Sequence, residues 1–272
     1  MSPGPAISSR QNPRFKRALG LREARERREQ GRFLVDGARE IGRALDAGLA
    51  LVEAWLAPDR LSDEASRALL PRLHAARVEL IETTPELMAR IAYGERDEGL
   101  VVVVEAPPTD LDRLALPPDA LVSVVEGIEK PGNLGALLRS ADGAGVDAVI
   151  VADPISDTWN PNAIRASVGT IFSLPLAVAA AVQALAFLRG KGIAVVAARV
   201  DASAEYDAID LTGPVALVVG SEDAGLGPTW SGPDVAAVRI PMLGVADSLN
   251  VSASAAVLFY EARRQRRADH RS

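Results

Sequence analysis

The sequence LVVGSEDAGLGPTWSGPDVAAVRIPMLGVADSLNVSAS occupies residues 217–254 and decides the fold of the chain. In order, it predicts a buried strand at 216–219, a glycine-rich turn at 220–228, a second strand at 235–240, a turn at 241–247 and a helix that opens at Ser248. Neighbouring parallel strands of an open α/β sheet end at one edge, and ligands bind in the crevice outside that edge. We therefore expect both turns and the polar start of the helix to meet in one ligand pocket.

Four short motifs carry a family resemblance. In chain order they are Asn133-Leu-Gly-Ala-Leu-Leu-Arg139, Gly220-Ser-Glu222, Ile240-Pro241-Met242 and Ser248-Leu249-Asn250-Val-Ser252. The first resembles the first signature motif of the SpoU/TrmH branch of the SPOUT RNA methyltransferases, and the others together resemble its second and third motifs. Their order and spacing are similar to those of the family. The resemblance is strong from Leu121 to the C-terminus and looser before it.

This resemblance implies a C-terminal SPOUT domain, which is a Rossmann-like α/β domain with a parallel sheet and a deep trefoil knot. It also implies a smaller α/β domain in front of it that binds the RNA substrate. We expect the N-terminal domain over residues 1–106, a linker over 107–119 and the knotted methyltransferase domain over 120–272. Paired prolines near both ends of the linker cannot sit inside a helix or a sheet ladder, so they favour an extended connection.

The resemblance further implies transfer of a methyl group from S-adenosylmethionine to a ribose 2′-hydroxyl of structured RNA. The run from Glu129 to Gly135 is more similar to ribosomal-RNA members than to transfer-RNA members, which favours 23S-type ribosomal RNA as the substrate. The implied catalytic residues are Arg139, Asn133, Glu222, Ser248 and Asn250, with Arg139 acting on the hydroxyl. The implied cofactor-binding residues are Gly220, Ile240, Leu249, Leu217, Met242 and Ala198. We also expect a homodimer, formed through the apolar face of Ala253, Ala256, Val257 and Tyr260 on the last helix.

Composition narrows the chemistry of the 272-residue chain. It contains no cysteine, which excludes disulfides and thiolate sites and fits a reducing cytoplasm. Its two histidines, His74 and His270, lie far apart in the sequence, so we expect no metal site and no histidine acid-base chemistry. No apolar run approaches the length of a membrane span, and the N-terminus lacks the basic-then-apolar order of a signal peptide. We expect a soluble cytoplasmic protein that works without a membrane or a metal.

The charge distribution points to RNA more clearly than the net charge of −6 does. Both ends of the chain are basic and the middle is acidic. The candidate RNA-binding residues are Arg10, Arg14, Lys16, Arg17 and Arg165, and the last helix ends in Arg263, Arg264, Arg266, Arg267 and Arg271. For the stretch from Glu23 to Glu29, a solvated helix face with i,i+4 ion pairs such as Glu23 with Arg27 is an equal alternative.

Periodicity predicts two α/β domains. In the first, it predicts one basic helix from Asn12 to Gly31 and then strands and helices in alternation, with a largely parallel sheet. The expected elements that follow are strands at 33–35, 52–56, 78–81 and 100–105 and helices at 38–47, 63–76 and from 84. In the second, it predicts strands at 121–126, 148–151 and 193–198 and helices at 133–144 and 178–189.

Other functions stay open at this point. Within the same reaction class, the alternative substrate is transfer RNA. A chain that binds RNA or ribosomes without catalysis is a further alternative, although such a binder has no physical reason to keep Asn133, Arg139, Glu222, Ser248 and Asn250 together. The N-terminal domain could also be purely structural or support a dimer. A dehydrogenase-like α/β enzyme needs a glycine-rich phosphate loop after a strand, and the sequence has none.

Overall fold

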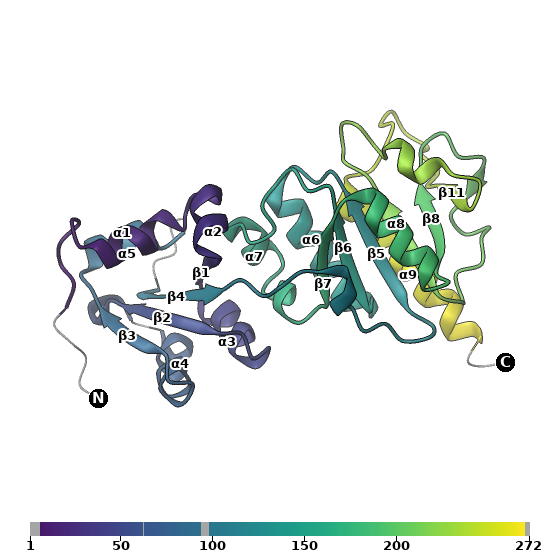
Figure 1. Cartoon of the computed structure of the whole chain (residues 1–272). Helices are drawn as coiled ribbons and strands as arrows, with labels where there is room; N and C mark the ends of the chain where they lie inside the picture. Colours follow the sequence, from purple (N-terminus) through teal and green to yellow (C-terminus); the bar gives the residue numbers. More distant parts are fainter. Residues whose placement is uncertain (1–5, 62, 94–97, 270–272) are drawn as a thin grey trace. The chain divides into compact units, whose positions relative to one another are not determined.

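The computed structural model describes residues 6–61, 63–93 and 98–269 (Figure 1). By their internal contacts these residues form two compact units. The N-terminal unit comprises residues up to Pro107 together with Trp159–Ser173, and the C-terminal unit comprises Pro108–Thr158 and the residues from Leu174 onward. The segment 159–173 therefore belongs structurally to the N-terminal unit, although the sequence places it between two strands of the C-terminal unit.

The N-terminal unit is built on a four-stranded sheet with the order β1-β4-β2-β3. Its strands are β1 (Arg32–Asp36), β2 (Leu51–Leu56), β3 (Glu79–Glu82) and β4 (Leu100–Glu105). Only β2 and β3 are parallel, because β4 enters between β1 and β2 and runs antiparallel to both. The prediction of a largely parallel sheet is wrong here: the last and most apolar strand of the unit takes a central place and reverses its direction.

The helices of this unit are α1 (Pro13–Gly20), α2 (Ala24–Gln30), α3 (Ala38–Asp46), α4 (Glu64–Ala75) and α5 (Pro85–Ile91), with a short 3₁₀ turn η1 (Pro58–Arg60). The single basic helix predicted from Asn12 to Gly31 is in fact two helices. The cause is Arg27, whose side chain is buried and donates to the backbone carbonyls of Leu21 and Arg22 at 2.8 Å each. Arg27 thereby satisfies carbonyl groups that follow the end of α1.

The segment 159–173 is held by aromatic and polar contacts within the N-terminal unit. It contains α7 (Pro161–Ala166) and the 3₁₀ turn η3 (Thr170–Phe172). The ring of Trp159 stacks on Phe33 with a centroid distance of 4.8 Å. Arg43 Nη1 donates to the carbonyl of Val168 at 2.7 Å. These contacts explain why the segment groups with β1 and α3.

The C-terminal unit contains a seven-stranded sheet with the order β7-β6-β5-β10-β8-β11-β9, and every neighbouring pair is parallel. The strands are β5 (Leu121–Glu126), β6 (Ala148–Ala152), β7 (Leu176–Ala179), β8 (Ala194–Ala198), β9 (Ala204–Glu205), β10 (Val215–Val219) and β11 (Val235–Arg239). Every residue of β5, β6 and β10 is buried, as in a parallel sheet covered on both faces. The prediction of a parallel α/β domain is confirmed.

The helices of the C-terminal unit are α6 (Pro131–Ala144), α8 (Ala181–Gly190) and α9 (Val251–Asp269), with 3₁₀ turns η2 (Leu111–Arg113) and η4 (Pro228–Ser231). Helix α8 packs on one sheet face through Ala184 and Leu188, while α9 lies beside α6 and against β10. Helix α6 begins at Pro131 rather than at Asn133, because proline is favoured at the first helical position. None of the described helices could cross a membrane.

Two further predictions for this unit need correction. Residues 176–179 form β7, whereas the sequence predicted that the following helix already starts at Val178. The proline-rich stretch after Pro107 is not a free extended connection, because Leu114 is buried in the core and Thr109 accepts a hydrogen bond from Val178 N at 2.8 Å. The trefoil knot stays a prediction of the family resemblance.

Candidate active site

Three parallel strands place their carboxyl ends around one cavity in the C-terminal unit. Strands β8, β10 and β11 are adjacent in the sheet, and each is followed by a loop that lines a cavity of about 510 Å³. The first turn of α9 completes the wall with Val251 and Ser254. This is the ligand crevice that the topology of an open α/β sheet predicts, and its volume suits a small organic ligand.

Five of the six residues predicted to bind the cofactor line this cavity. They are Ala198, Gly220, Ile240, Met242 and Leu249. Leu217 does not line it, because its side chain is fully buried inside β10, two residues before the end of the strand. Ser248 also lines the cavity.

Gly220 shapes the first loop by allowing it to fold back on itself. A Cβ atom at Gly220 would lie 2.2 Å from the carbonyl carbon and oxygen of Gly225, closer than any real side chain allows. Ser221 and Gly225 exchange two backbone hydrogen bonds of 3.1 Å, which close the turn. The close neighbour of Gly220 is thus the backbone of the loop itself.

Glu126 ties the far end of the same loop to the central strand. Its largely buried carboxylate accepts a hydrogen bond of 2.6 Å from the backbone N–H of Gly227. A side chain at Gly227 would come within 3.1 Å of this carboxylate. Sequence reasoning missed Glu126, although its position at the end of a buried strand is a usable signal.

The cavity combines apolar walls with acidic groups, and this chemistry fits S-adenosylmethionine. Ile240 and Leu249 provide apolar surface, and the carboxylates of Glu222, Asp223 and Asp247 line the same space. S-adenosylmethionine carries a cationic sulfonium and an ammonium group, which negative side chains attract. The sequence did not single out Asp223 or Asp247.

A hydrogen-bonded cluster of four polar side chains borders this cavity. Glu222 is its centre: it accepts from Lys130 Nζ at 2.8 Å and from Asn133 Nδ2 at 3.1 Å. Asn250 Nδ2 also donates to Glu222 and to Asn133 Oδ1, the latter at 3.3 Å. Three of the predicted catalytic residues are therefore brought together from three separate parts of the chain. Lys130 was missed, although it lies only three residues before the first motif.

Asn250 has a second role as the cap of α9. Its Oδ1 accepts hydrogen bonds from the backbone N–H of Ser252 at 3.0 Å and from Ser252 Oγ at 2.6 Å. An asparagine at this position satisfies one of the free N–H groups at a helix start. The same side chain thus fixes the beginning of α9 with its oxygen and holds Glu222 with its nitrogen.

The electrostatics of the cluster keep Glu222 ionised. The hydrogen bond from Lys130 is the largest of several influences that lower the pKa of Glu222, and the amides of Asn133 and Asn250 act in the same direction. Correspondingly, Glu222 raises the pKa of Lys130. A carboxylate with a lowered pKa is a weak base, so Glu222 is suited to holding its neighbours in place rather than to taking a proton.

Arg139 and Ser248 lie outside this cluster. Arg139 is exposed and follows Asn133 by six residues, which is about 9 Å along the helix axis. Within the described parts of the chain, neither the Arg139 guanidinium nor the Ser248 hydroxyl makes a hydrogen bond or an ion pair. The Arg139 side chain is thus available to a ligand on the outer surface of α6.

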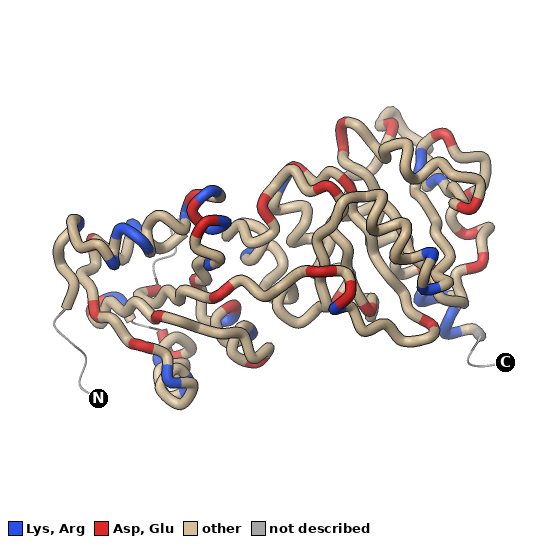
Figure 2. Tube along the Cα trace, in the orientation of Figure 1, with Lys and Arg blue, Asp and Glu red and all other residues tan. Residues whose placement is uncertain are grey.

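Basic residues lie along α1 and α2 (Figure 2), and the hydrogen bonds of the predicted RNA-binding cations show that these cations differ in availability. Arg14 donates to Glu53 at 2.9 Å and to Glu79 at 2.8 and 2.5 Å, so internal carboxylates already occupy it. The hydrogen bond with Glu79 is the largest cause that raises the pKa of Arg14. Arg165 is also committed internally, 3.6 Å from the buried Asp36, whose pKa is raised mainly by burial.

The other three cations are exposed at the surface. Lys16 Nζ reaches Gln11 at 2.5 Å. Arg10 and Arg17 make no side-chain hydrogen bond or ion pair with any residue that the structure describes. Only these three of the five candidates therefore present charge to a partner.

Comparison with known proteins agrees with this geometry. Residues 120–260 match the model of the SpoU rRNA Methylase family, and residues 12–102 match the MRM3-like substrate binding domain. A 23S rRNA (uridine(2479)-2′-O)-methyltransferase from Streptomyces viridochromogenes is 35% identical, over 96% of this chain and 92% of that protein.

Solved structures show the same similarity over both units. The SpoU methyltransferase AviRb from Streptomyces viridochromogenes, in complex with the cofactor AdoMet, has a TM-score of 0.88 at 32% identity, covering 95% of this chain and 99% of the other. An RNA 2′-O ribose methyltransferase has a TM-score of 0.81 at 41% identity and covers 96% of this chain and 99% of the other. The family model spans more than half of the chain, and the cavity, the polar cluster and Arg139 all lie within the matched residues. The chain belongs to the SpoU rRNA methylase family.

Proposed function

We propose that this protein transfers a methyl group from S-adenosylmethionine to a ribose 2′-hydroxyl of 23S-type ribosomal RNA. The observation that carries the proposal is the position of Glu222, which lines the cofactor-sized cavity and is also the centre of the cluster with Asn133 and Asn250. A protein that bound RNA without catalysis would not need one carboxylate to belong to both the cavity and the polar cluster. The 23S rRNA methyltransferase that is 35% identical to the chain supports the choice of substrate.

The residues of the cavity would hold S-adenosylmethionine, which supplies an electrophilic methyl group when bound. The loops after β8, β10 and β11 offer backbone groups and the apolar side chains of Ile240, Met242 and Leu249. Glu126 and the Ser221–Gly225 turn keep the first of these loops in shape.

The ribose hydroxyl is a poor nucleophile until its proton is withdrawn. Arg139 is the side chain that we assign to this hydroxyl, because it is exposed and uncommitted on the helix that carries Asn133. A guanidinium stays protonated at physiological pH, so Arg139 orients the hydroxyl and stabilises the developing alkoxide, while the hydroxyl proton passes to a neighbouring RNA phosphate or to water. Ser248 and Asn250 add hydrogen-bonding groups between the cavity and this helix.

The N-terminal unit, with boundaries near residues 1–106, would bind the RNA through exposed cations. Arg10, Lys16 and Arg17 lie at or near α1 and face solvent. Such contacts with phosphates position an RNA without reading its sequence. Arg14 and Arg165 contribute to this surface only indirectly, by holding the fold of the unit.

A homodimer and a cytoplasmic location complete the proposal. Ala253, Ala256, Val257 and Tyr260 follow helical spacing along α9, and none of them is buried in the single chain. Tyr260 is 55% exposed, which is unusual for a large aromatic ring without a partner. A second copy of the chain would cover this face. The absence of cysteine supports a reducing compartment.

Radioactive S-adenosylmethionine tests the function directly. The purified full chain is incubated separately with unmodified 23S ribosomal RNA and with bulk transfer RNA, and stops in primer extension at low nucleotide concentration then locate the modified ribose. We expect label only in the ribosomal RNA and one strong stop. Label in transfer RNA alone would make transfer RNA the substrate, and label in neither would reduce the protein to an RNA binder.

A further inference from the structure

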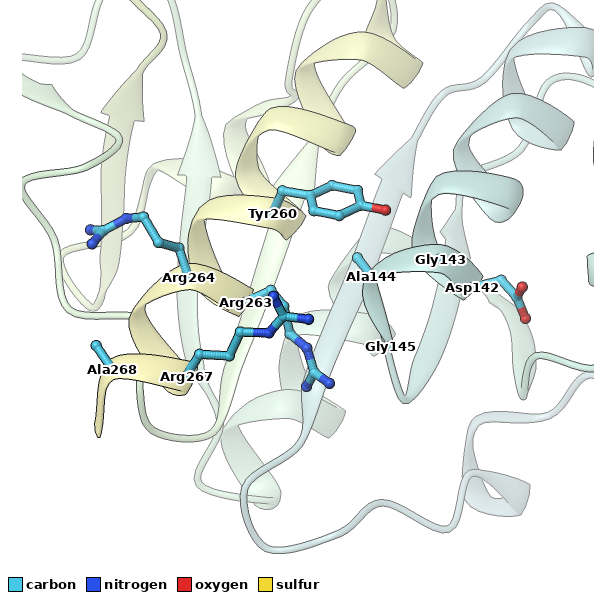
Figure 3. A pocket seen from close by; sticks show the side chains of 9 residues that line it. All are labelled: Asp142, Gly143, Ala144, Gly145, Tyr260, Arg263, Arg264, Arg267 and Ala268. Atoms are coloured by element: carbon cyan, nitrogen blue, oxygen red, sulfur yellow. The ribbon is translucent and has the colours of Figure 1, made fainter. Parts of the chain in front are cut away.

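A hollow of about 840 Å³ lies between the C-terminal ends of α6 and α9 (Figure 3). Tyr260 projects into it from α9, and this ring belongs to the face that the proposed second copy covers. Its wall from α6 includes Asp142, which already interacts within the chain. In a homodimer this hollow is therefore covered. The cofactor cavity lies at the opposite end of α9, where Val251 and Ser254 line it.

Two charged residues of the cofactor cavity have no part in the polar cluster around Glu222. Arg199 and Asp201 lie on the loop that follows β8, on either side of Val200, and all three line the cavity. Arg199 Nε donates to Asp201 Oδ1 and Arg199 Nη2 donates to Asp201 Oδ2, each at 2.9 Å. The two side chains thus form a bidentate ion pair in the wall of the cavity. Neither residue was predicted from the sequence to belong to the site.

Several hydrogen bonds hold this ion pair in place. Arg199 Nη1 donates to the hydroxyl of Ser231, and the backbone N–H of Arg199 donates to the Val238 carbonyl at 2.8 Å. The backbone N–H of Ala202 donates to the Arg199 carbonyl at 3.3 Å, which closes the turn. The Asp201 carboxylate therefore has a fixed position, although 65% of its side chain is exposed.

Stability alone does not explain the pair, because exposed ion pairs contribute little to it. The arrangement leaves the Asp201 carboxylate with free acceptor positions. Each carboxylate oxygen can accept two hydrogen bonds, and Arg199 occupies one position on each. Two neighbouring acceptor positions, one on each oxygen, match the two adjacent hydroxyl groups of a ribose. An acidic residue binds a ribose hydroxyl in dinucleotide-binding α/β folds in the same way.

The charge of Asp201 distinguishes it from the other carboxylates of the cavity. Arg199 neutralises it, and the hydrogen bond from Arg199 is the largest cause that lowers the pKa of Asp201, so the carboxylate stays ionised. The Glu222 carboxylate is occupied by the polar cluster. Asp223 and Asp247 also line the cavity, but within the described parts of the chain neither side chain makes a hydrogen bond or an ion pair. Their uncompensated charges favour the cationic sulfonium and ammonium groups of S-adenosylmethionine, whereas a neutralised and fixed acceptor suits uncharged hydroxyl groups.

The order of the strands places the ribose of the donor beside this pair. Glu222 follows β10 and is bonded to Asn133 on the side of β5, and the target hydroxyl is assigned to Arg139 on α6, so the transferred methyl group lies on that side. Strand β8 is the next strand beyond β10, about 4.8 Å further across the sheet. A single methylene joins the sulfonium to the ribose, so a donor that points its methyl group toward α6 has its ribose near the loop after β8. Ile240 and Met242, on the loop after the adjoining β11, then provide apolar surface for the adenine.

We infer that Asp201 binds the ribose hydroxyl groups of S-adenosylmethionine and that Arg199 is a positioning residue that holds the Asp201 carboxylate. Val200, which is 74% exposed between the two, adds apolar surface for the sugar and the base. This inference rests on the methyl donor of the proposed function but not on its RNA substrate. It assigns the loop after β8 to recognition of the donor, whereas the polar cluster serves the target hydroxyl.

Calorimetry on the full chain tests the contact with S-adenosylhomocysteine and with its 2′,3′-dideoxy analogue, which lacks both ribose hydroxyls. The wild type should bind the parent compound about 10- to 150-fold more tightly than the analogue, the range for hydrogen bonds to a charged acceptor. Asp201→Ala should lower the affinity for the parent compound by a similar factor and leave the affinity for the analogue unchanged.

A second ion pair of the same unit provides the matched control. Arg189 donates to Asp234 through two nitrogens at 2.6 Å each, and both side chains are about half exposed. Neither residue lines the cofactor cavity. Asp234→Ala should therefore bind both compounds as the wild type does.

Arg199→Gln tests the positioning role. The Asp201 carboxylate is then neither fixed nor neutralised, so the preference for the parent compound over the analogue should decrease. The freed negative charge should at the same time raise the affinity for cationic S-adenosylmethionine relative to S-adenosylhomocysteine. A purely structural role of Arg199 would leave that ratio unchanged.

Several results would overturn the inference. A wild type that binds the parent compound and the analogue equally, or an Asp201→Ala variant with wild-type affinity, would show that no ribose contact exists. An equal loss for both compounds in Asp201→Ala would mean that Asp201 acts only through the shape of the loop. A loss confined to S-adenosylmethionine would place Asp201 at the sulfonium.

Methylation of ribosomal RNA tests the proposed function separately, because calorimetry with these compounds requires no RNA. A wild type that binds S-adenosylhomocysteine but methylates no RNA would contradict the proposed function alone.

Discussion

Gly220 and Gly225 approach each other so closely that a single added carbon on Gly220 would lie 2.2 Å from the Gly225 carbonyl group. Two backbone hydrogen bonds between Ser221 and Gly225 hold this turn. The turn carries Glu222, which belongs to both the cavity and the polar cluster. The shape of this one short turn therefore determines whether Glu222 can line the cavity and hold the polar cluster at the same time.

Replacing Gly220 with valine should weaken binding of S-adenosylmethionine. The side chain forces the turn open, at a cost of about 1 to 3 kcal/mol for overpacking, which corresponds to roughly 5- to 150-fold in affinity. Calorimetry on the purified variant measures the change. Gly213→Ala serves as the control, because a Cβ atom there meets nothing within 4 Å. An unchanged affinity in the Gly220 variant would show that this turn does not take part in cofactor binding.

Glu222→Gln should lower the melting temperature at pH 7, because glutamine keeps an acceptor for the two asparagines but loses the ion pair with Lys130. The folded-state pKa of Glu222 is lowered from its ordinary value of 4.5, so its contribution to stability is fully present above that value. The contribution is lost as the pH falls through the folded-state pKa. In thermal melts from pH 7 to pH 3, the difference in melting temperature between the wild type and Glu222→Gln should therefore shrink. A constant difference would contradict this role of the Glu222 carboxylate.

The exposed and the internally paired arginines of the N-terminal unit should behave differently. Arg10→Gln/Arg17→Gln should reduce the salt slope of RNA binding by about 0.7 to 0.9 per lost phosphate contact. Arg14→Gln should leave the slope unchanged but lower the free energy of unfolding by about 1 to 2 kcal/mol, because Glu53 and Glu79 lose a charged donor. Filter binding and chemical denaturation separate the two effects. If Arg14→Gln lowered the salt slope and the double variant did not, Arg14 would bind RNA instead of Glu53 and Glu79.

A glutamate in the apolar stripe of α9 should dissociate the homodimer. Val257→Glu places a charge in the face that a second copy would cover, whereas Val182→Glu places one on α8, where the valine is already 68% exposed. Sedimentation at micromolar concentration should give a monomer for the first variant and a dimer for the second. If the wild-type chain is itself a fully active monomer, the dimer proposal fails.

Much of the C-terminal unit follows directly from local sequence. The strand predicted at Leu121–Glu126 coincides with β5, because a run of apolar residues bounded by a glycine turn suits a central parallel strand. The meeting of three loops at one cavity also follows, because the carboxyl ends of parallel strands share an edge. Strand β7 was missed since its four residues merge with the apolar start of α8, and short apolar runs do not distinguish strand from helix.

Tertiary partners decide the features that sequence could not predict. Arg27 has the spacing of a solvated surface pair with Glu23, yet it is buried and donates to the carbonyls between α1 and α2. Arg14 looks like an RNA-facing cation until Glu53 and Glu79, far away in sequence, come beside it. Lys130 was not predicted to belong to the site at all, because only the fold brings its ammonium group within 2.8 Å of the Glu222 carboxylate. Charge along a sequence does not reveal which charges are already paired.

Arg139 is the residue that we assign to the chemical step. Arg139→Ala should reduce the rate of RNA methylation by about 10²- to 10⁴-fold, the range of a positioned group that assists proton transfer. S-adenosylmethionine binding should stay normal, because Arg139 is exposed on α6 and does not line the cofactor cavity. Single-turnover methylation with the donor at saturation separates this effect from binding.

Arg139→Lys distinguishes the two ways in which the side chain could act. Lysine keeps the positive charge but lacks the planar fork that can hold a hydroxyl oxygen and a phosphate oxygen together. If orientation is required, the lysine variant stays close to the alanine variant in rate. Recovery of most of the wild-type rate would instead indicate simple electrostatic stabilisation of the alkoxide. An alanine variant that methylates RNA at the wild-type rate would show that Arg139 has no part in the chemistry.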